Sequence, residues 1–208
     1  MATKKRVSSA PETVDIPPIN LQRIKLRIVG DTSLITHKFS DASIKGIEAK
    51  QQHAPLAPRG ARNPEQEYED AKYKLPDGRC AMIGAAFKRA AVEACRMVPN
   101  MPMTEARVLF HVLDDLVLLE GEPEMRTDMR RLESGTFDPV YRPEFKEWAC
   151  EITVVYNAGM MSQAQLVNLF NLAGLGGVGD WRASAPKGKS GNHGMFHIEE
   201  VKPVKVRS

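Results

Sequence analysis

The sequence predicts an α+β domain in which one antiparallel sheet carries two helices on the same face. Segments of alternating apolar and polar residues are interleaved with segments of helical periodicity, in the order strand, helix, strand, strand, helix, strand. The chain has 208 residues, of which 42% are hydrophobic and 26% charged, and this suits one domain with insertions. The order is that of the ferredoxin-like or RRM-like split βαβ fold, which leaves the other sheet face open to a partner.

We expect residues 1–19 to form a disordered arm, because they lack periodicity. The domain proper spans residues 20–201, and its first strand is predicted at 21–29. Apolar side chains of this strand point one way, and three cations point the other. A strand face with three cations indicates either an ordinary solvated surface or one that follows a nucleic-acid backbone. These candidate binding residues are Arg23, Lys25 and Arg27.

A long insertion at about residues 37–76 follows the first strand and is rich in charge. A short strand is expected at 34–39 and a short helix at 41–51. An insertion of this length in a compact domain is usually functional or disordered, so we expect a flexible, thumb-like projection that becomes ordered on a partner. Its candidate nucleic-acid-binding residues are Lys45, Lys50, Arg59 and Arg62.

The middle of the chain begins with a helix whose apolar stripe runs from Ile83 to Val98. The charged residues of its outer side are Lys88, Arg89, Glu93 and Arg96. Two strands, at 106–113 and 116–120, are predicted to pair as a hairpin that turns at an Asp-Asp corner.

A second insertion covers residues 121–147, where a short amphipathic helix is expected at 125–132. The strand predicted at 148–156 follows this insertion. Its alternation puts Cys150, Ile152, Val154 and Tyr156 on the core face.

The last helix is expected to begin at Ser162, which forms a capping box with Gln165, and to end at Gly174. A glycine-dense segment with several cations then precedes the last strand, at 195–201, and a basic tail, at 202–208. Glycine lets a backbone approach a ligand closely, so this segment suits a phosphate chain. Its candidate binding residues are Gly176, Gly177, Trp181, Arg182, Lys187 and Lys189.

Several other classes of protein are disfavoured. The same glycines match the dinucleotide-binding spacing G-x-G-x-x-G, but they follow a helix and precede a strand, the reverse of what that motif requires. Three widely spaced cysteines indicate reduced core thiols, so we expect no metal or other cofactor. No apolar run has the length of a membrane span, and the N-terminus lacks a secretion signal, which predicts a cytoplasmic protein. The net charge of +3 decides nothing about partners.

Two segments resemble the RAMP superfamily, the repeat-associated RNA-binding proteins that form the backbone of CRISPR effector complexes. The family has a stretch like I-P-G-S-S-L-K-G-A-L-R at the start of its first helix, and the segment MIGAAFKRAAV resembles it. The matching residues are Met82, Gly84, Phe87, Lys88 and Ala90. Ile83 replaces the proline, and Ala85 and Ala86 replace the two serines, so phosphate contact at this helix would depend on Lys88 and backbone amides.

The family also has a loop like G-G-x-x-x-G-x-G between its last helix and last strand, and the glycine-dense segment resembles it. The residues that carry this resemblance are Gly176, Gly177, Arg182, Gly191 and Gly194. Together the two segments imply a non-catalytic subunit that binds single-stranded nucleic acid, with guide RNA expected, and multimerises along it beside other effector subunits. The first insertion resembles the thumb of such subunits. Trp181, and Tyr68 or Tyr73, are candidates to stack on bases.

Cleavage is not carried over by the resemblance. Some members of the family cut target RNA with an acidic residue in a Gly-hydrophobic-Asp setting, which is absent around Asp31 and Asp41. Two alternatives stay open. One is a phage or mobile-element protein that binds or anneals single-stranded DNA on the same fold. The other is a metal-dependent nuclease that would use Asp114, Asp115 and His111, although a turn explains the Asp-Asp pair equally.

Overall fold

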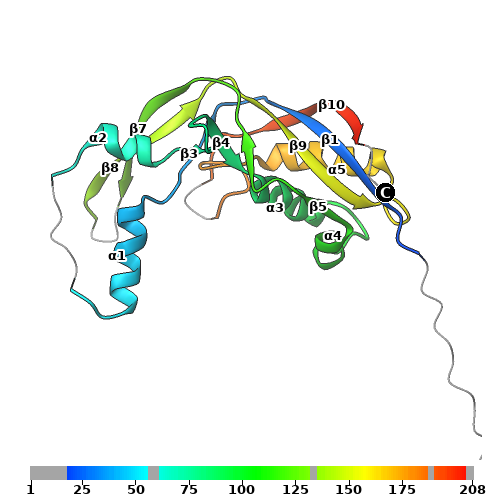
Figure 1. The fold of residues 1–208 in the computed structure, drawn as a ribbon, viewed down its shortest axis with the longest axis horizontal. Coiled ribbons are helices and arrows are strands. Elements are labelled where there is room, and N and C mark those ends of the chain that lie inside the picture. Colours follow the sequence, from blue (N-terminus) through cyan, green and yellow to red (C-terminus); the bar gives the residue numbers. More distant parts are fainter. Residues whose placement is uncertain (1–17, 56–60, 132–134, 187–189, 205–208) are drawn as a thin grey trace, which may run out of the picture.

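The main sheet has four antiparallel strands in the order β10-β1-β9-β5. The computed structural model describes residues 18–55, 61–131, 135–186 and 190–204. Figure 1 shows helices α3 and α5 lying together on one side of this sheet. This topology confirms the predicted split βαβ fold. The elements are β1 (Leu21–Gly30), α3 (Gly84–Ala94), β5 (Phe110–Val112), β9 (Ala149–Asn157), α5 (Gln163–Gly176) and β10 (Phe196–Val204).

The core lies between the sheet and these helices. In β1 the alternating residues Ile24, Leu26 and Ile28 are buried, as are the four residues of β9 that the sequence assigned to the core face. Across from them, α3 buries Phe87 and α5 buries Phe170. Each fully buried side chain of this size contributes about 1.5–3 kcal/mol to folding, so the period-2 and period-3.6 patterns determine which faces meet.

Glycines let the helices approach their neighbours closely. A Cβ on Gly84 would lie 1.8 Å from the carbonyl oxygen of Asp114, and one on Gly174 would lie 1.8 Å from that of Phe196. The prediction that Gly174 ends the last helix is wrong, because α5 continues through Gly176 and Gly177 caps it. The predicted capping box between Ser162 and Gln165 is confirmed.

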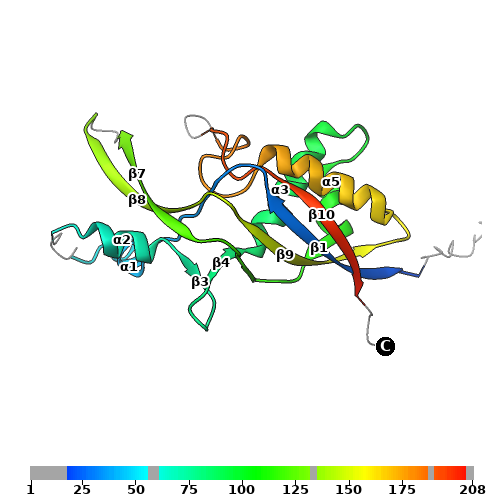
Figure 2. The ribbon, with the colours of Figure 1, turned by 90° about the horizontal axis from the view of Figure 1, so that it is seen from above.

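Two smaller sheets adjoin the main one, with strand orders β2-β8-β7 and β3-β4-β6. Figures 1 and 2 show α1, α2 and the β7–β8 hairpin projecting together from one end of the domain, and we call this projection the arm. These elements are β2 (Leu34–Ile35), α1 (Asp41–Gln51), α2 (Pro64–Asp70), β3 (Tyr73–Lys74), β4 (Cys80–Ile83), β6 (Leu116–Leu118), β7 (Pro123–Arg131) and β8 (Phe137–Phe145).

The arm combines both insertions of the sequence. Arg62, just before α2, forms an ion pair of 2.5 Å with Asp138 of β8 and lies over the ring of Tyr141. The Tyr68 hydroxyl of α2 donates to the carbonyl oxygen of Pro123 at 2.7 Å. The helix expected at 41–51 is confirmed as α1, whereas the strand expected at 34–39 is limited to Leu34–Ile35.

Two predictions for the middle of the chain are wrong. Residues 106–113 and 116–120 do not form a hairpin, because β5 joins β9 in the main sheet while β6 pairs with β4. Residues 106–109, predicted as strand, instead form the end of helix α4 (Met103–Leu109). The apolar residues alone could not show which partner each strand would find.

The helix predicted at 125–132 is also wrong, since this segment lies in β7 and pairs along its whole length with β8. A short charged segment has weak periodicity, so cross-strand pairing determines its structure. At the C-terminal end, β10 continues through Val204, so Lys202 belongs to the strand rather than to a tail. In the described ranges, no helix is both long and apolar enough to cross a membrane.

We predict that Gly84→Ala destabilises the protein by about 1–3 kcal/mol or more, because its methyl group would collide with a backbone carbonyl that cannot rotate away. Gly46→Ala in α1 is the matched control, since its Cβ would meet nothing within 4 Å. The control should be neutral or stabilising by up to about 1 kcal/mol. Thermal melting of both variants tests this, and equal melting temperatures would contradict it.

Candidate functional site

A cleft of about 300 Å³ lies between the start of α3 and the segment that follows α5. One wall is formed by the first turns of α3 and the other by residues 177–182, which we call the glycine loop. Two residues of the first insertion complete it, His37 and Tyr73. The remaining lining residues are Met82, Ile83, Ala85, Ala86, Arg89, Ala90, Glu93, Gly177, Val178, Gly179, Asp180 and Arg182.

Two positions require glycine, one at the start of the glycine loop and one where the chain returns toward β10. Gly177 has a φ of 72°, and a Cβ there would lie 2.8 Å from the carbonyl oxygen of His193. Gly194 has a φ of 70°, and its carbonyl oxygen accepts from the Val178 amide at 2.9 Å. Residues with a side chain adopt such φ values only at a cost, so these glycines are required by the backbone path.

Contacts with β2 and β8 hold the glycine loop in place. The Asp180 amide donates to the carbonyl oxygen of Ile35 at 2.9 Å. The Asp180 carboxylate lies 3.4 Å from Nη1 of Arg142 and 3.3 Å from Nδ1 of His37. Arg142 is 7% exposed, whereas the Asp180 side chain is 38% exposed, so only one partner of this ion pair is buried. One carboxylate thus links the glycine loop to the root of the arm and to the cleft wall.

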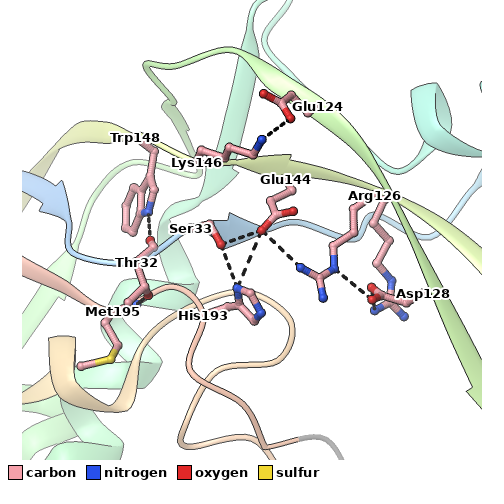
Figure 3. Close-up of polar contacts among 11 residues, drawn as sticks. Thr32, Ser33, Glu124, Arg126, Asp128, Glu144, Lys146, Trp148, His193 and Met195 are labelled. Atoms are coloured by element: carbon pink, nitrogen blue, oxygen red, sulfur yellow. Dashed lines mark hydrogen bonds and ion pairs between the residues drawn. The ribbon is translucent and has the colours of Figure 1, made fainter.

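A second polar cluster joins His193, which follows the glycine loop in the chain, to the arm (Figure 3). The Ser33 hydroxyl donates to Oε1 of Glu144 at 2.7 Å and lies 2.8 Å from Nδ1 of His193. Arg126 lies between Glu144, at 3.3 Å, and Asp128, at 2.9 Å. Burial raises the pKa of Glu144, but the Ser33 hydroxyl and the Arg126 guanidinium outweigh it and leave this pKa below its ordinary value. Glu144 is therefore an anion at neutral pH.

Cations stand on both walls of the cleft. Arg182 donates from Nη1 to the carbonyl oxygen of Gly179 at 2.9 Å and from Nε to the Ser184 hydroxyl at 3.1 Å. On the opposite wall, the Arg89 side chain is 69% exposed and forms an ion pair of 3.0 Å with Glu93. An exposed pair of this kind is worth little, so Arg89 can exchange Glu93 for a phosphate.

The cleft continues into a second hollow along the outer side of α3. Ala85, Arg89 and Glu93 line both spaces. We call the cleft and this hollow together the α3 groove. The further residues of the second hollow are Lys88, Val92, Arg96, Met103 and Arg107. Five Lys and Arg side chains and two carboxylates therefore line the described groove, which gives it an excess of positive charge.

The predicted site residues fall into separate places. Gly177 and Arg182 line the cleft, Gly176 ends α5 beside it, and Lys88 lies in the second hollow, where its Nζ is 2.9 Å from Nδ1 of His111. Trp181 does not line the cleft, and its indole nitrogen is buried with no hydrogen-bond partner among the residues that the structure describes. The predictions for Arg59, Lys187 and Lys189 lie outside the described residues.

The cations of β1 lie on the sheet face that points away from the helices. Lys25 forms an ion pair of 2.6 Å with Glu151 of β9. The two terminal nitrogens of the Arg27 guanidinium donate to the two carboxylate oxygens of Glu120. This face therefore carries balanced charge rather than the cationic stripe expected from β1, although Arg23 stays exposed. The glutamates come from distant segments, so the alternation of β1 could not reveal them.

The candidate residues of the first insertion lie in the arm. Lys45 and Lys50 are exposed on α1, and Arg62 is held by Glu67 and Asp138. The Lys72 ammonium lies over the Tyr68 ring, 3.9 Å from the ring centroid. The Tyr68 hydroxyl donates to the carbonyl oxygen of Pro123 in the hairpin, so Tyr68 is not free to stack on a base.

The residues of the nuclease alternative serve the fold. Oδ2 of Asp114 accepts the Thr153 amide at 2.6 Å, and the Asp115 carbonyl oxygen accepts the Gly84 amide at 2.9 Å. His111 faces Lys88. In the part of the chain that the structure describes, no three His, Cys, Asp or Glu side chains gather as a metal site would require.

The structure adds His37 and Arg89 to the site, and it moves Tyr73 from a general stacking candidate into the cleft wall. The sequence did carry a signal for Arg89, which lies on the polar side of the first helix beside Lys88. His37 comes from a segment without periodicity, and only its tertiary contact with Asp180 reveals it.

Taken together, the fold and the groove define a ferredoxin-like domain with a cationic groove along α3. No family model matches the sequence, and no curated protein matches it. Solved structures similar to the chain include a type III-B Cmr-beta complex bound to cognate target RNA, with 10% identity, a TM-score of 0.47 and coverage of 89% of this chain and 61% of that chain.

Cmr6 from Pyrococcus furiosus is similar over 88% of this chain and 100% of its own, at 10% identity and a TM-score of 0.43. A CRISPR RNA-guided surveillance complex is similar over 86% of this chain and 68% of that chain, at 12% identity and a TM-score of 0.38. At TM-scores below 0.5, these likenesses do not assign a function.

We predict that Glu144→Gln destabilises the protein by about 1–3 kcal/mol at neutral pH, because the hydrogen bonds that the charged carboxylate accepts from Ser33 and Arg126 are weakened. The pKa of Glu144 is lowered in the folded state, so its contribution is present above the unfolded pKa and disappears as pH falls through the folded one. Urea unfolding at a series of pH values should show the two proteins converging in acid.

Glu48→Gln on the exposed surface of α1 is the control and should follow the unmodified protein at every pH. A stability difference between Glu144→Gln and the unmodified protein that is constant from neutral to acid pH would show that the charge of Glu144 is not involved.

Proposed function

We propose that this protein binds single-stranded nucleic acid along the α3 groove, with RNA as its natural ligand, as a non-catalytic subunit of a CRISPR-type effector assembly. The observation that carries the proposal is the continuity of the groove. Its cations come from the glycine loop, from α3 and from the segment after it, and they follow one another along one surface. Such a path attracts a phosphodiester chain without reading its sequence.

The start of α3 strengthens this attraction. Its cap residue, Ile83, offers no side-chain hydrogen bond to the amides of the first turn. The Gly84 amide donates to Asp115, but the other amides of this turn and the helix dipole favour an anion at this end of the helix, where Ala85 and Ala86 line the cleft. Phosphate contact here can therefore combine backbone amides with Arg89 and Arg182.

The preference for RNA rests on the sequence resemblance. The two segments that resemble the RAMP superfamily are distant in the chain, yet they form the two facing walls of the cleft. Their convergence supports a role like that of the family's guide-binding subunits. A single-stranded DNA-binding protein would use the same cations, so binding of matched RNA and DNA strands has to be compared directly.

We predict that Arg182→Glu or Arg89→Glu weakens binding of a fluorescein-labelled oligoadenylate by roughly tenfold or more, because each change replaces a cation on the phosphate path with an anion. Each lost contact should also reduce the slope of log affinity against log salt by about 0.7. Fluorescence anisotropy at several salt concentrations measures both quantities.

Arg79→Glu is the control, because Arg79 lies in the turn between β3 and β4 and lines neither hollow. Its effect should be small. Equal losses in Arg79→Glu and Arg182→Glu would indicate binding by overall charge rather than by the groove.

We also propose that the arm joins copies of the chain along the strand. Helix α1 has no buried residue, and its Ile44 and Ile47 are 41% and 48% exposed, with Phe39 beside it 61% exposed. A helix of 11 residues is marginal by itself in water, so α1 would gain stability by packing these side chains on a neighbouring copy.

We predict that Ile44→Asp combined with Ile47→Asp abolishes assembly on long single-stranded RNA but leaves the affinity for a short oligoadenylate unchanged. Charged residues cannot be buried in an apolar contact without a large cost. Light scattering and electron microscopy with RNA report assembly, and Ala42→Asp in the same exposed helix is the control. Arrays that persist in the double variant would exclude this surface.

A further inference from the structure

We infer that the cleft holds a single unstacked nucleobase, while Arg89 and Arg182 at its rim hold the phosphates on either side. This inference rests on the proposed function and goes beyond it, because it assigns a base-binding subsite to a groove otherwise described only by its charges. The adjoining hollow would carry the backbone onward.

The floor of the cleft is apolar. Met82, Ile83, Ala85, Ala86, Ala90 and Val178 contribute to its lining. A phosphate gains nothing from such a surface and loses its hydration there. A base has two apolar faces and a polar edge, so it gains from the same surroundings. The small alanine side chains of α3 leave room for a flat ring against the helix.

Two ring side chains form the wall that comes from the first insertion. Tyr73 lies in β3, where it pairs with Ala81 of β4, next to Met82 of the floor. His37 is held by the Asp180 carboxylate at 3.3 Å. Burial and the Asp180 carboxylate raise the pKa of the Tyr73 phenol, so it stays neutral and can donate to a base edge. Stacking on such rings is independent of base identity.

The size of the cleft limits what can enter. Its volume of about 300 Å³ is at the lower end of the range for small-molecule sites. A base pair inside a duplex cannot reach a cleft of this size, whereas a base turned out of a single strand can. Because Arg89 and Arg182 stand on opposite walls, a strand that crosses the cleft passes both.

The experiment compares a fluorescein-labelled oligoadenylate with an oligomer of the same length built from base-free tetrahydrofuran units. We expect the unmodified protein to bind the oligoadenylate about tenfold more tightly than the base-free strand, because one base stacked on an aromatic side chain contributes this much. Tyr73→Ala should lose this preference, and Tyr73→Phe should retain most of it.

Ala85→Leu should also abolish the preference, because Ala85 is exposed on α3 and a larger side chain there would fill the cleft without disturbing the core. Ala164→Leu is the matched control, since Ala164 is an exposed alanine at the second position of α5, as Ala85 is of α3. Circular dichroism establishes that each variant is folded.

The two proposals fail in different ways. Equal binding of both strands by the unmodified protein, with a clear loss in Arg182→Glu, would overturn the base subsite and leave the phosphate groove. If neither strand binds, or if Arg182→Glu leaves the affinity for both strands unchanged, the proposed function is overturned as well. A base preference unchanged in both Tyr73→Ala and Ala85→Leu would place the base elsewhere and overturn the subsite.

Discussion

The site depends on one constraint, the attachment of the glycine loop to the short strand β2. The Asp180 amide of the glycine loop donates to the carbonyl oxygen of Ile35 in β2, and the Gly194 amide, further along the chain, donates to that of Ser33, just before β2. β2 itself is bonded to β8. The buried Arg142 of β8 reaches the partly exposed Asp180 carboxylate, which adds a charged link to this attachment. Without this attachment, the glycines would give the loop no defined shape.

This arrangement makes the arm and the cleft parts of one structure. The β7–β8 hairpin contributes Arg126 and Glu144 to the links shown in Figure 3 and Arg142 to the ion pair with Asp180, while α2 is bonded to the hairpin through Tyr68. A partner that moves the arm would therefore shift Arg142, and through its ion pair with Asp180 it would also shift the wall of the cleft. In the assembly that we propose, these charges would couple strand binding to contact between neighbouring copies.

The positions of the predicted cations show why a sequence indicates a kind of surface better than its location. Lys25 and Arg27 alternate correctly out of the core, but glutamates from β9 and from the segment after β6 neutralise them. The motif indicates Lys88, whereas its neighbour Arg89 lines the cleft. One residue of helical rotation, about 100°, separates these outcomes, and only packing against β5 and the glycine loop selects between them.

By itself, the sequence determined the elements whose periodicity is strong: the core face of β1 and β9, the cap of α5 at Ser162, helix α1, and the split βαβ order. These follow from local patterns of burial and capping, which each segment carries alone. Tertiary structure alone decided the pairing of β7 with β8, the separation of β5 from β6, and the meeting of His37, Tyr73 and Arg89 in one cleft. Such contacts join segments far apart in the chain, and their energy comes from partners that no local pattern names.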